Sequence, residues 1–354
     1  MGARGPAVSV VLSVYNMARY LDETMASILG QTLSDLEVIC VNDGSTDSSL
    51  DILERYAGAD ERVVVVDQIN AGQSAARNAG WARARGRYIL HMDADDILEP
   101  EALATLVARC DDDDLDLLRF NMTAFPDTPD MVATAEGEMR RWRVRTATEG
   151  TVTGGELLEM LVAEGSYSPV TWLYLIRAEV VSVRDSAFAP VRYHEDAIFT
   201  PHAFLAARRT ASVTDSLIRR RVRAGSQGKG SRANGDLSDR LYMLRDLSEL
   251  AASERTAGRP VHFAPHVVAR LSQVPTAWRI LGDSAARSAV AERAENAVLA
   301  PALAELVRID DRTAKARDRV ERAVARNRAI ERNPVLHAVA KAMGAIARRS
   351  GRVG

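Results

Sequence analysis

The first 125 residues alternate between short apolar runs and segments whose apolar residues recur three and four positions apart. Short β-branched runs predict buried strands, and the wider spacing predicts helices. The pattern predicts strands at 7–14, 36–42, 62–67, 86–92 and 115–122, with helices at 19–29, 48–57, 72–85 and 101–110. Strands separated by helices indicate an α/β fold with a mostly parallel sheet flanked by helices.

The pattern changes beyond residue 125. Residues 126–150 are polar and irregular, so we expect no regular element there. A helix is predicted from about 151, followed by an apolar stretch at 169–181 and by a helix that begins near residue 195.

The chain is longer than one compact domain usually needs, since it has 354 residues. We expect an α/β domain over residues 1–235 and a helical region over 236–354, where the sequence becomes rich in Ala, Leu and Arg. Hydrophobic residues make up 47% and charged residues 27%, which are ordinary globular values. The net charge of −2 argues against nucleic-acid binding, although the segment from Arg312 to the end carries 12 Lys and Arg against three Asp and Glu.

Targeting signals are weak. We expect the N-terminus to form the first strand rather than a signal peptide, and no run approaches the about 18 apolar residues of a membrane span. Two isolated cysteines give neither a disulfide framework nor a metal-site spacing, which is typical of a reducing compartment. We therefore expect a cytoplasmic protein, with Cys40 in the core.

Three carboxylates, Asp93, Asp95 and Asp96, directly follow a predicted strand. Adjacent carboxylates raise one another's pKa unless a cation compensates, and Mg²⁺ or Mn²⁺ prefers such oxygen ligands. Ligands of open parallel sheets bind beyond the carboxyl ends of the strands. We expect this cluster and Asp43, which ends another strand, to face one crevice. A solvated acidic loop is the alternative, and it is our interpretation of residues 111–114.

Two further motifs contain candidate ligand contacts. In VNDGSTDSS (41–49), Gly44 permits a tight turn with positive φ, and the Asp43 carboxylate can accept from the N3–H of a uracil ring. A plain strand-to-helix turn is the alternative. In NAGQSAARNAG (70–80), Arg77 lies on a predicted helix, where it can either reach a phosphate or brace the aspartates.

Four motifs occur in one order over about residues 7–100: VSVVLSVYN, VNDGSTDSS, NAGQSAARNAG and YILHMDADD. This combination resembles the family 2 glycosyltransferases of GT-A fold, and the similarity continues more loosely to about residue 230. The resemblance implies inverting transfer from a nucleotide-diphosphate sugar, most simply a UDP-sugar, with Mg²⁺ or Mn²⁺. Its nucleotide-binding half would be about 7–125 and its acceptor half about 126–235.

The resemblance also implies roles for individual residues. Ser13 and Asp43 would lie against the base, and Arg77 near the diphosphate. Ribose contact and metal coordination would be shared among the aspartates, with Asp95 and Asp96 as metal ligands. The implied donor-binding residues of the N-terminal half are Ser13, Tyr15, Asp43, Arg77, Asp93 and Asp95.

The motif YHEDAIF (193–199) resembles the acidic motif of the same family and implies Asp196 as catalytic base, with Glu195 as a supporting partner. A helix is predicted to begin there, so we expect its positive end to lower the carboxylate pKa. Two acids that merely favour a helix start are the alternative. His194 and His202 lack further metal ligands nearby and do not indicate a zinc site.

The basic segment 219–235 resembles one that follows the last strand of the family, where Arg221, Arg223 and Ser226 would approach the diphosphate. Its glycines and positive charge suit a lid over phosphates, and a basic linker is the alternative. Trp172, Tyr174 and His194 are candidate acceptor contacts; for the two aromatics we favour core packing.

The helical region 236–354 resembles no family that we can name. Its last segment, NPVLHAVAKAMGAIARRSG, places apolar residues along one face of a helix and predicts contact with an anionic membrane surface, docking on the catalytic domain, or pairing with a second copy. The implied acceptor is a hydroxyl of a glycan, a cell-wall polymer or a lipid-linked molecule. The alternatives are a phosphatase of the haloacid dehalogenase type and a non-catalytic nucleotide-sugar binder.

Overall fold

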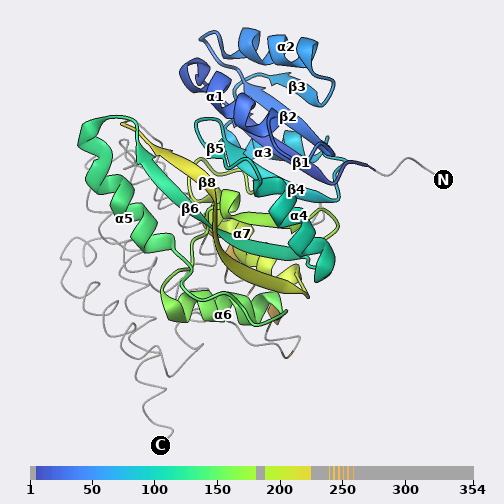
Figure 1. Cartoon of the computed structure of the whole chain (residues 1–354), viewed down its shortest axis with the longest axis vertical. Helices are drawn as coiled ribbons and strands as arrows, with labels where there is room; N and C mark the ends of the chain where they lie inside the picture. The colour runs from blue at the N-terminus through green and yellow to red at the C-terminus, as the bar shows by residue number, and fades with distance from the viewer. Residues whose placement is uncertain are drawn as a thin grey trace, which may run out of the picture. The chain divides into compact units, whose positions relative to one another are not determined.

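The computed structural model describes residues 5–180 and 188–224, together with isolated positions between 239 and 258 (Figure 1). By its internal contacts the chain divides into one unit of Met1–Pro190 and Glu195–Gly230 and another of Val191–His194 and Ser231–Gly354. The elements below belong to the first unit. The predicted helical region 236–354, including the basic tail and its proposed membrane contact, lies almost entirely outside the described residues.

The N-terminal half of the sheet is parallel, as the sequence predicts. Within the described residues the strand order is β3-β2-β1-β4-β7-β6-β8-β5. The first four strands pair in parallel, and β2 and most of β1 and β4 are buried, which fits their apolar runs. Their bounds are Val8–Val14 for β1, Leu36–Asp43 for β2, Val63–Gln68 for β3 and Tyr88–Asp93 for β4.

The other half of the sheet is mixed. Strand β7 runs antiparallel to both β4 and β6, whereas β6 and β8 pair in parallel and lie side by side in Figure 1. The bounds are Ile97–Leu98 for β5, Leu117–Pro126 for β6, Tyr174–Arg177 for β7 and Thr210–Val222 for β8. The prediction of a mostly parallel sheet is therefore confirmed for the part that carries the first two motifs and the aspartates.

The helices mostly follow the predicted spacing. Their bounds are Ala18–Leu29 for α1, Ser49–Ala59 for α2, Gln73–Trp81 for α3, Ala102–Asp112 for α4, Val132–Trp142 for α5, Gly154–Glu164 for α6 and Glu195–Ala206 for α7, with short 3-10 turns at Pro129–Met131 and Thr171–Leu173. Within the described part of the chain, no helix combines the length and the hydrophobicity that crossing a bilayer requires.

Two expectations about elements are wrong. Residues 126–150 are not irregular, because α5 forms there and packs on β6. Its polar face and Gly137 weaken the apolar signal, so tertiary packing rather than periodicity decides this helix. The first residues of the basic segment, Arg219–Val222, are not a loop after the last strand but the end of β8. They pair with the last residues of β6, Thr123–Pro126.

Helix α3 lies very close to the sheet at Gly80. It packs on β1 and β2, and a Cβ atom at Gly80 would lie 2.4 Å from Cγ1 of Val11. This distance is shorter than real Cβ contacts, so only glycine fits without displacing the helix. The close approach fixes the position of Arg77, which lies about one turn earlier on the same helix.

We predict that Gly80→Ala destabilises the fold by about 1–3 kcal/mol, because the added methyl group overpacks the α3–β1 contact. The matched control is Gly137→Ala in α5, where a Cβ would meet nothing within 4 Å. There the alanine is expected to stabilise the helix by up to about 1 kcal/mol. Urea unfolding of both variants measures the difference, and equal stabilities would contradict the packing argument.

Candidate active site

The functional motifs meet at the carboxyl edge of the parallel strands. Asp43 is the last residue of β2 and Asp93 the last of β4, and β1 lies between these two strands. In the parallel register Ser13 of β1 lies beside Asp93. Asp43 and the aspartate cluster therefore share one edge of the sheet, and that they face one crevice stays a prediction.

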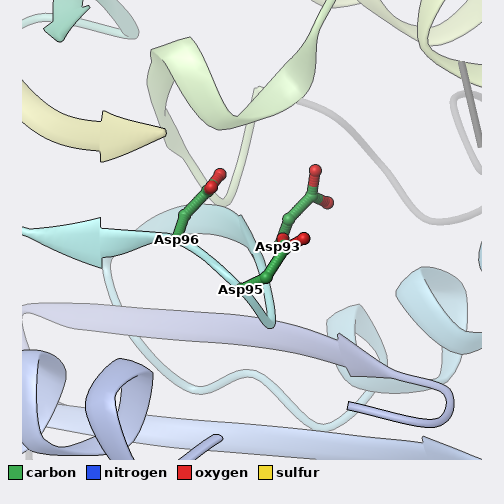
Figure 2. A group of neighbouring side chains, drawn as sticks. All are labelled: Asp93, Asp95 and Asp96. Carbon is green, nitrogen blue, oxygen red and sulfur yellow. The ribbon is translucent and has the colours of Figure 1, made fainter. Parts of the chain in front are cut away.

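The three aspartates extend from a single turn that joins β4 to β5 (Figure 2). The backbone N–H of Asp96 donates to the Asp93 carbonyl at 3.2 Å, and the Thr24 hydroxyl donates to the Asp96 carbonyl at 2.9 Å. One carboxylate oxygen from each aspartate lies within 4.8 Å of the others. The turn thus holds three acids together on one side.

The environment of this cluster favours a cation. Asp95 and Asp96 are buried, and the side chain of Asp93 is 29% exposed. Burial, followed by repulsion from the neighbouring carboxylates, raises the pKa of Asp95 and raises that of Asp96 well above its ordinary value. Oδ2 of Asp96 has no hydrogen-bond partner among the described residues. A divalent cation relieves both the repulsion and the unpartnered oxygen, so these residues fit one.

Two arginines from the end of β8 contact the same turn. Nε of Arg223 donates to Oδ2 of Asp95 at 2.5 Å, and the backbone N–H of Arg221 donates to Oδ1 of Asp96 at 2.9 Å. The Arg221 guanidinium also donates to the Asp95 carbonyl at 3.1 Å. Both arginines therefore lie next to the acidic cluster, and their approach to a diphosphate stays a prediction; Ser226 lies outside the described residues.

Arg77 is the centre of a buried charge network. Its side chain is 4% exposed, and its Nη1 lies 2.6 Å from Oδ1 of Asp196 and 3.0 Å from Oε1 of Glu195. Its Nη2 lies 3.4 Å from Oδ1 of Asp93. Burial alone would lower the pKa of Arg77, but these carboxylates outweigh it and raise that pKa. Of the two roles expected for this arginine, the structure has it bracing the aspartates.

The candidate base, Asp196, begins helix α7 beside Glu195. We expected the helix terminus to lower its pKa, and this is wrong. Burial raises the pKa of Asp196 to about 7; the Arg77 charge offsets part of the rise, and the charges of Glu195 and Asp93 add to it. The Thr171 hydroxyl also donates to Oδ1 of Asp196, at 3.4 Å. Desolvation therefore outweighs the helix dipole, whose effect near a terminus is modest.

Asp43 accepts three hydrogen bonds from its own chain. Its carboxylate accepts from Nε2 of Gln68 at 2.7 Å and from the backbone N–H groups of Ala71 and Gly72 at 2.8 and 2.9 Å. It thereby fixes the turn that leads into α3. Gly44, which follows it, has φ +65°, which confirms the predicted positive-φ turn. A carboxylate offers about four acceptor positions, so one is still available.

Of the two other donor-binding candidates at this edge, Ser13 is half-buried and Tyr15 is exposed. The Tyr15 side chain, just after β1, is 45% exposed. An exposed aromatic ring beside polar groups is a suitable surface for a planar base. Both residues therefore stay candidates.

The aromatic acceptor candidates lie in the core. Trp172 and Tyr174 are 2% and 1% exposed. The Trp172 ring packs 6.0 Å from the ring of Trp142, and the Tyr174 hydroxyl donates to the Ser168 carbonyl. This burial supports the core-packing interpretation over acceptor stacking. His194 belongs to the other unit, where its φ is +69°.

Sequence reasoning missed the buried surroundings of Arg77. His91 lies two residues before Asp93 on β4, with its ring 5.4 Å from Trp81 and 5.0 Å from Phe188. Burial and then the Arg77 charge lower its pKa well below the ordinary value, so it is neutral. The Arg77 guanidinium lies over the Phe188 ring at 5.2 Å. The available signal was the strand period of two, which puts His91 and Asp93 on one face.

With this geometry established, comparison with known proteins identifies the class. Residues 9–153 match the family model described as "Glycosyl transferase family 2". The chain is 31% identical over 213 residues to the "Uncharacterized glycosyltransferase YibD" of Escherichia coli, and 33% identical over 213 residues to the "Uncharacterized glycosyltransferase EpsJ" of Bacillus subtilis; each match covers 60% of both chains. Over residues 9–153 the chain is therefore similar to glycosyl transferase family 2, which disfavours the phosphatase alternative.

Solved structures share the fold. The chain superposes on "S. aureus TarS 1-349 in complex with UDP" with a TM-score of 0.57 and 19% identity, covering 98% of this chain and 92% of that one. The same protein in complex with UDP-GlcNAc gives a TM-score of 0.58 and 18% identity, covering 97% and 92%. The fold is of the GT-A type. The match spans only about 60% of the length of these curated relatives, so it does not transfer the activity of the whole relatives to this chain.

We predict that Arg77→Met costs about 3–5 kcal/mol of stability at neutral pH, because it leaves Glu195 and Asp196 buried without their cation. The control is Arg55→Met, which removes a pair with Asp22 that is about 60% exposed on both sides. That loss should be within about 1 kcal/mol. Thermal and urea unfolding at pH 7.5 compare the two, and an Arg77 variant as stable as the control would contradict the network.

Proposed function

We propose that the chain is an inverting glycosyltransferase that moves a sugar from a nucleotide-diphosphate sugar to an acceptor hydroxyl. The observation that carries this proposal is the Arg77 network, which ties the acidic turn of β4 to the candidate base at the start of α7. The family match and the glycosyltransferase names of its relatives support the same reaction class. The acceptor would be a glycan, a cell-wall polymer or a lipid-linked molecule, met in the cytoplasm.

The donor would lie along the carboxyl edge of the sheet. Tyr15 offers an exposed ring to the base, and Asp43 has an acceptor position for a ring N–H. This pattern favours a uracil base, and a neighbour of the same fold was solved with UDP-GlcNAc. We therefore propose a UDP-sugar as donor, with Ser13 against its base and Asp93 close to its ribose.

A divalent cation would be held by the carboxylates of Asp95 and Asp96, with Asp93 beside them. When bound, such a cation supplies charge neutralisation for the departing nucleotide diphosphate. The guanidinium groups of Arg221 and Arg223 would add positive charge beside the same diphosphate. Mg²⁺ and Mn²⁺ are the hard cations that suit an all-oxygen site.

Asp196 would act as the general base. The acceptor oxygen attacks the anomeric carbon while the bond to the diphosphate breaks, and the hydroxyl proton passes to the Asp196 carboxylate. A single displacement of this kind inverts the anomeric configuration. Arg77 orients the carboxylate through its 2.6 Å contact, and the pKa of about 7 suits a base that must both take and release a proton near neutral pH.

The principal test of the base is Asp196→Asn. We predict that it lowers turnover by about 10²–10⁴, the usual loss for a general base, while the donor still binds. The donor is first chosen as the UDP-sugar that raises the melting temperature most in the presence of Mn²⁺. UDP release with and without acceptor then gives the rate, and Asp215→Asn, at an exposed position on β8, is the control. Full activity in the Asp196 variant would overturn the assignment, and donor binding with no transfer in the unmodified chain would favour a non-catalytic binder.

The pH dependence follows from the raised pKa. Because the base must be ionised, we predict that kcat/KM rises about tenfold per pH unit up to about 7 and then levels off. A kcat/KM that is flat from pH 5 to 8 would contradict the assignment of Asp196 as the base.

The dependence of stability on pH has the opposite sign. Asp196 binds its proton more tightly in the folded chain than in the unfolded chain, where its pKa is near 3.8. This contribution to stability is present below about 3.8 and is lost as pH rises to about 7.

A further inference from the structure

Arg223 forms an ion pair with Asp95, one of the three carboxylates of the acidic turn. Its Nε lies 2.5 Å from Oδ2 of Asp95, and the two side chains are 18% and 12% exposed. The other two aspartates are held differently. Asp96 receives a neutral backbone N–H from Arg221, and Asp93 faces Arg77 at 3.4 Å. Among the three, Asp95 alone has a short contact with a charged guanidinium in the described structure.

A guanidinium and a divalent cation compete for such an oxygen. Both are positive, and two positive charges within coordination distance of one buried oxygen repel strongly in a low-dielectric site. The Arg223 guanidinium already neutralises part of the negative charge that attracts a cation to the cluster. Binding of a cation through Oδ2 of Asp95 therefore requires Arg223 to move to another anion or to water.

Arg223 is held by fewer contacts than Arg221. The Arg221 guanidinium lies over the rings of Phe125 and Tyr20 at 4.5 and 5.0 Å, pairs with Glu23, and lies 3.6 Å from Asp127. Arg223 follows the end of β8; besides its pair with Asp95 it lies over the Tyr20 ring at 5.5 Å and donates a weak hydrogen bond from Nη2 to the Met17 sulfur at 3.5 Å. Moving Arg223 breaks one ion pair and one ring contact, whereas moving Arg221 breaks two ion pairs and two ring contacts.

We propose that Arg223 is an internal counter-ion, which pairs with Asp95 in the ligand-free chain and transfers to the donor diphosphate when cation and nucleotide bind together. This inference rests on the proposed function, since it needs a diphosphate ligand at the site. The diphosphate offers Arg223 a stronger, bidentate partner than the single oxygen it leaves. Cation and nucleotide then bind cooperatively, each increasing the affinity of the other by the same factor.

Removing the Arg223 guanidinium should therefore have opposite effects on the affinities for Mn²⁺ and for UDP. In Arg223→Gln, Asp95 is free for the cation, so Mn²⁺ binds about tenfold more tightly without nucleotide. The same variant binds UDP more weakly in the presence of Mn²⁺, and the cooperativity between the two ligands falls toward none. A residue that merely binds the donor would lower UDP affinity and leave Mn²⁺ affinity in the absence of nucleotide unchanged.

The experiment is a titration of the full chain with Mn²⁺, in which free Mn²⁺ is followed by its electron paramagnetic resonance signal, with and without UDP. The variants are Arg223→Gln and Arg223→Lys, which keeps a charge at the position and should fall between Gln and the unmodified chain. The control is Arg19→Gln, which removes a nearby charge that is 70% exposed. Thermal unfolding verifies that each variant is folded.

The proposal predicts weak Mn²⁺ binding to the unmodified chain alone, at least tenfold tighter binding with UDP, and tight binding to Arg223→Gln without UDP. Unchanged or weaker Mn²⁺ affinity in both Arg223 variants, with cooperative binding in the unmodified chain, would overturn the counter-ion role and leave the proposed function intact. An unmodified chain that binds neither Mn²⁺ nor UDP would overturn both.

Discussion

The structure depends on one buried guanidinium. Arg77 lies on α3, and its two terminal nitrogens reach Asp93 at the end of β4 and the Glu195–Asp196 pair at the start of α7. Three carboxylates in a poorly solvated region would otherwise repel one another or take up protons. Removing either side of this network leaves uncompensated buried charge, so the parallel half of the sheet and α7 are joined by electrostatics as much as by apolar packing.

The sheet topology explains why these groups can meet. Strand β4 ends the parallel run β3-β2-β1-β4, and its other neighbour, β7, runs antiparallel to it. The acidic turn therefore lies where this parallel run gives way to the mixed half of the sheet. Glycine at position 80 lets α3 lie close to β1 and β2, which places Arg77 above the strand ends. Aromatic rings and the neutral His91 exclude water from its other side and strengthen each ionic contact.

Much of this arrangement could be predicted from the sequence, and the failures have physical causes. The β-branched runs fixed the parallel strands, and Asp43, Asp93 and Arg77 fell at the expected edge because strand and helix periods are local properties. Helix α5 was missed because its polar sequence has a weak apolar stripe. The shift of the Asp196 pKa was given the wrong sign because burial by residues far away in the sequence, together with the charges of Glu195 and Asp93, raises it, and a local helix-dipole argument leaves these effects out. Trp172 and Tyr174 were better predicted by hydrophobicity than by their place in the motif.

Joint binding of a divalent cation and a nucleotide diphosphate at the acidic turn after β4 can be tested by diffraction at the manganese absorption edge, from crystals grown with Mn²⁺ and UDP. We expect one anomalous peak in contact with carboxylate oxygens of Asp95 and Asp96, with the uracil near Tyr15 and Asp43. Nucleotide bound at another face of the sheet, or ordered UDP with no anomalous signal at the three aspartates, would contradict it.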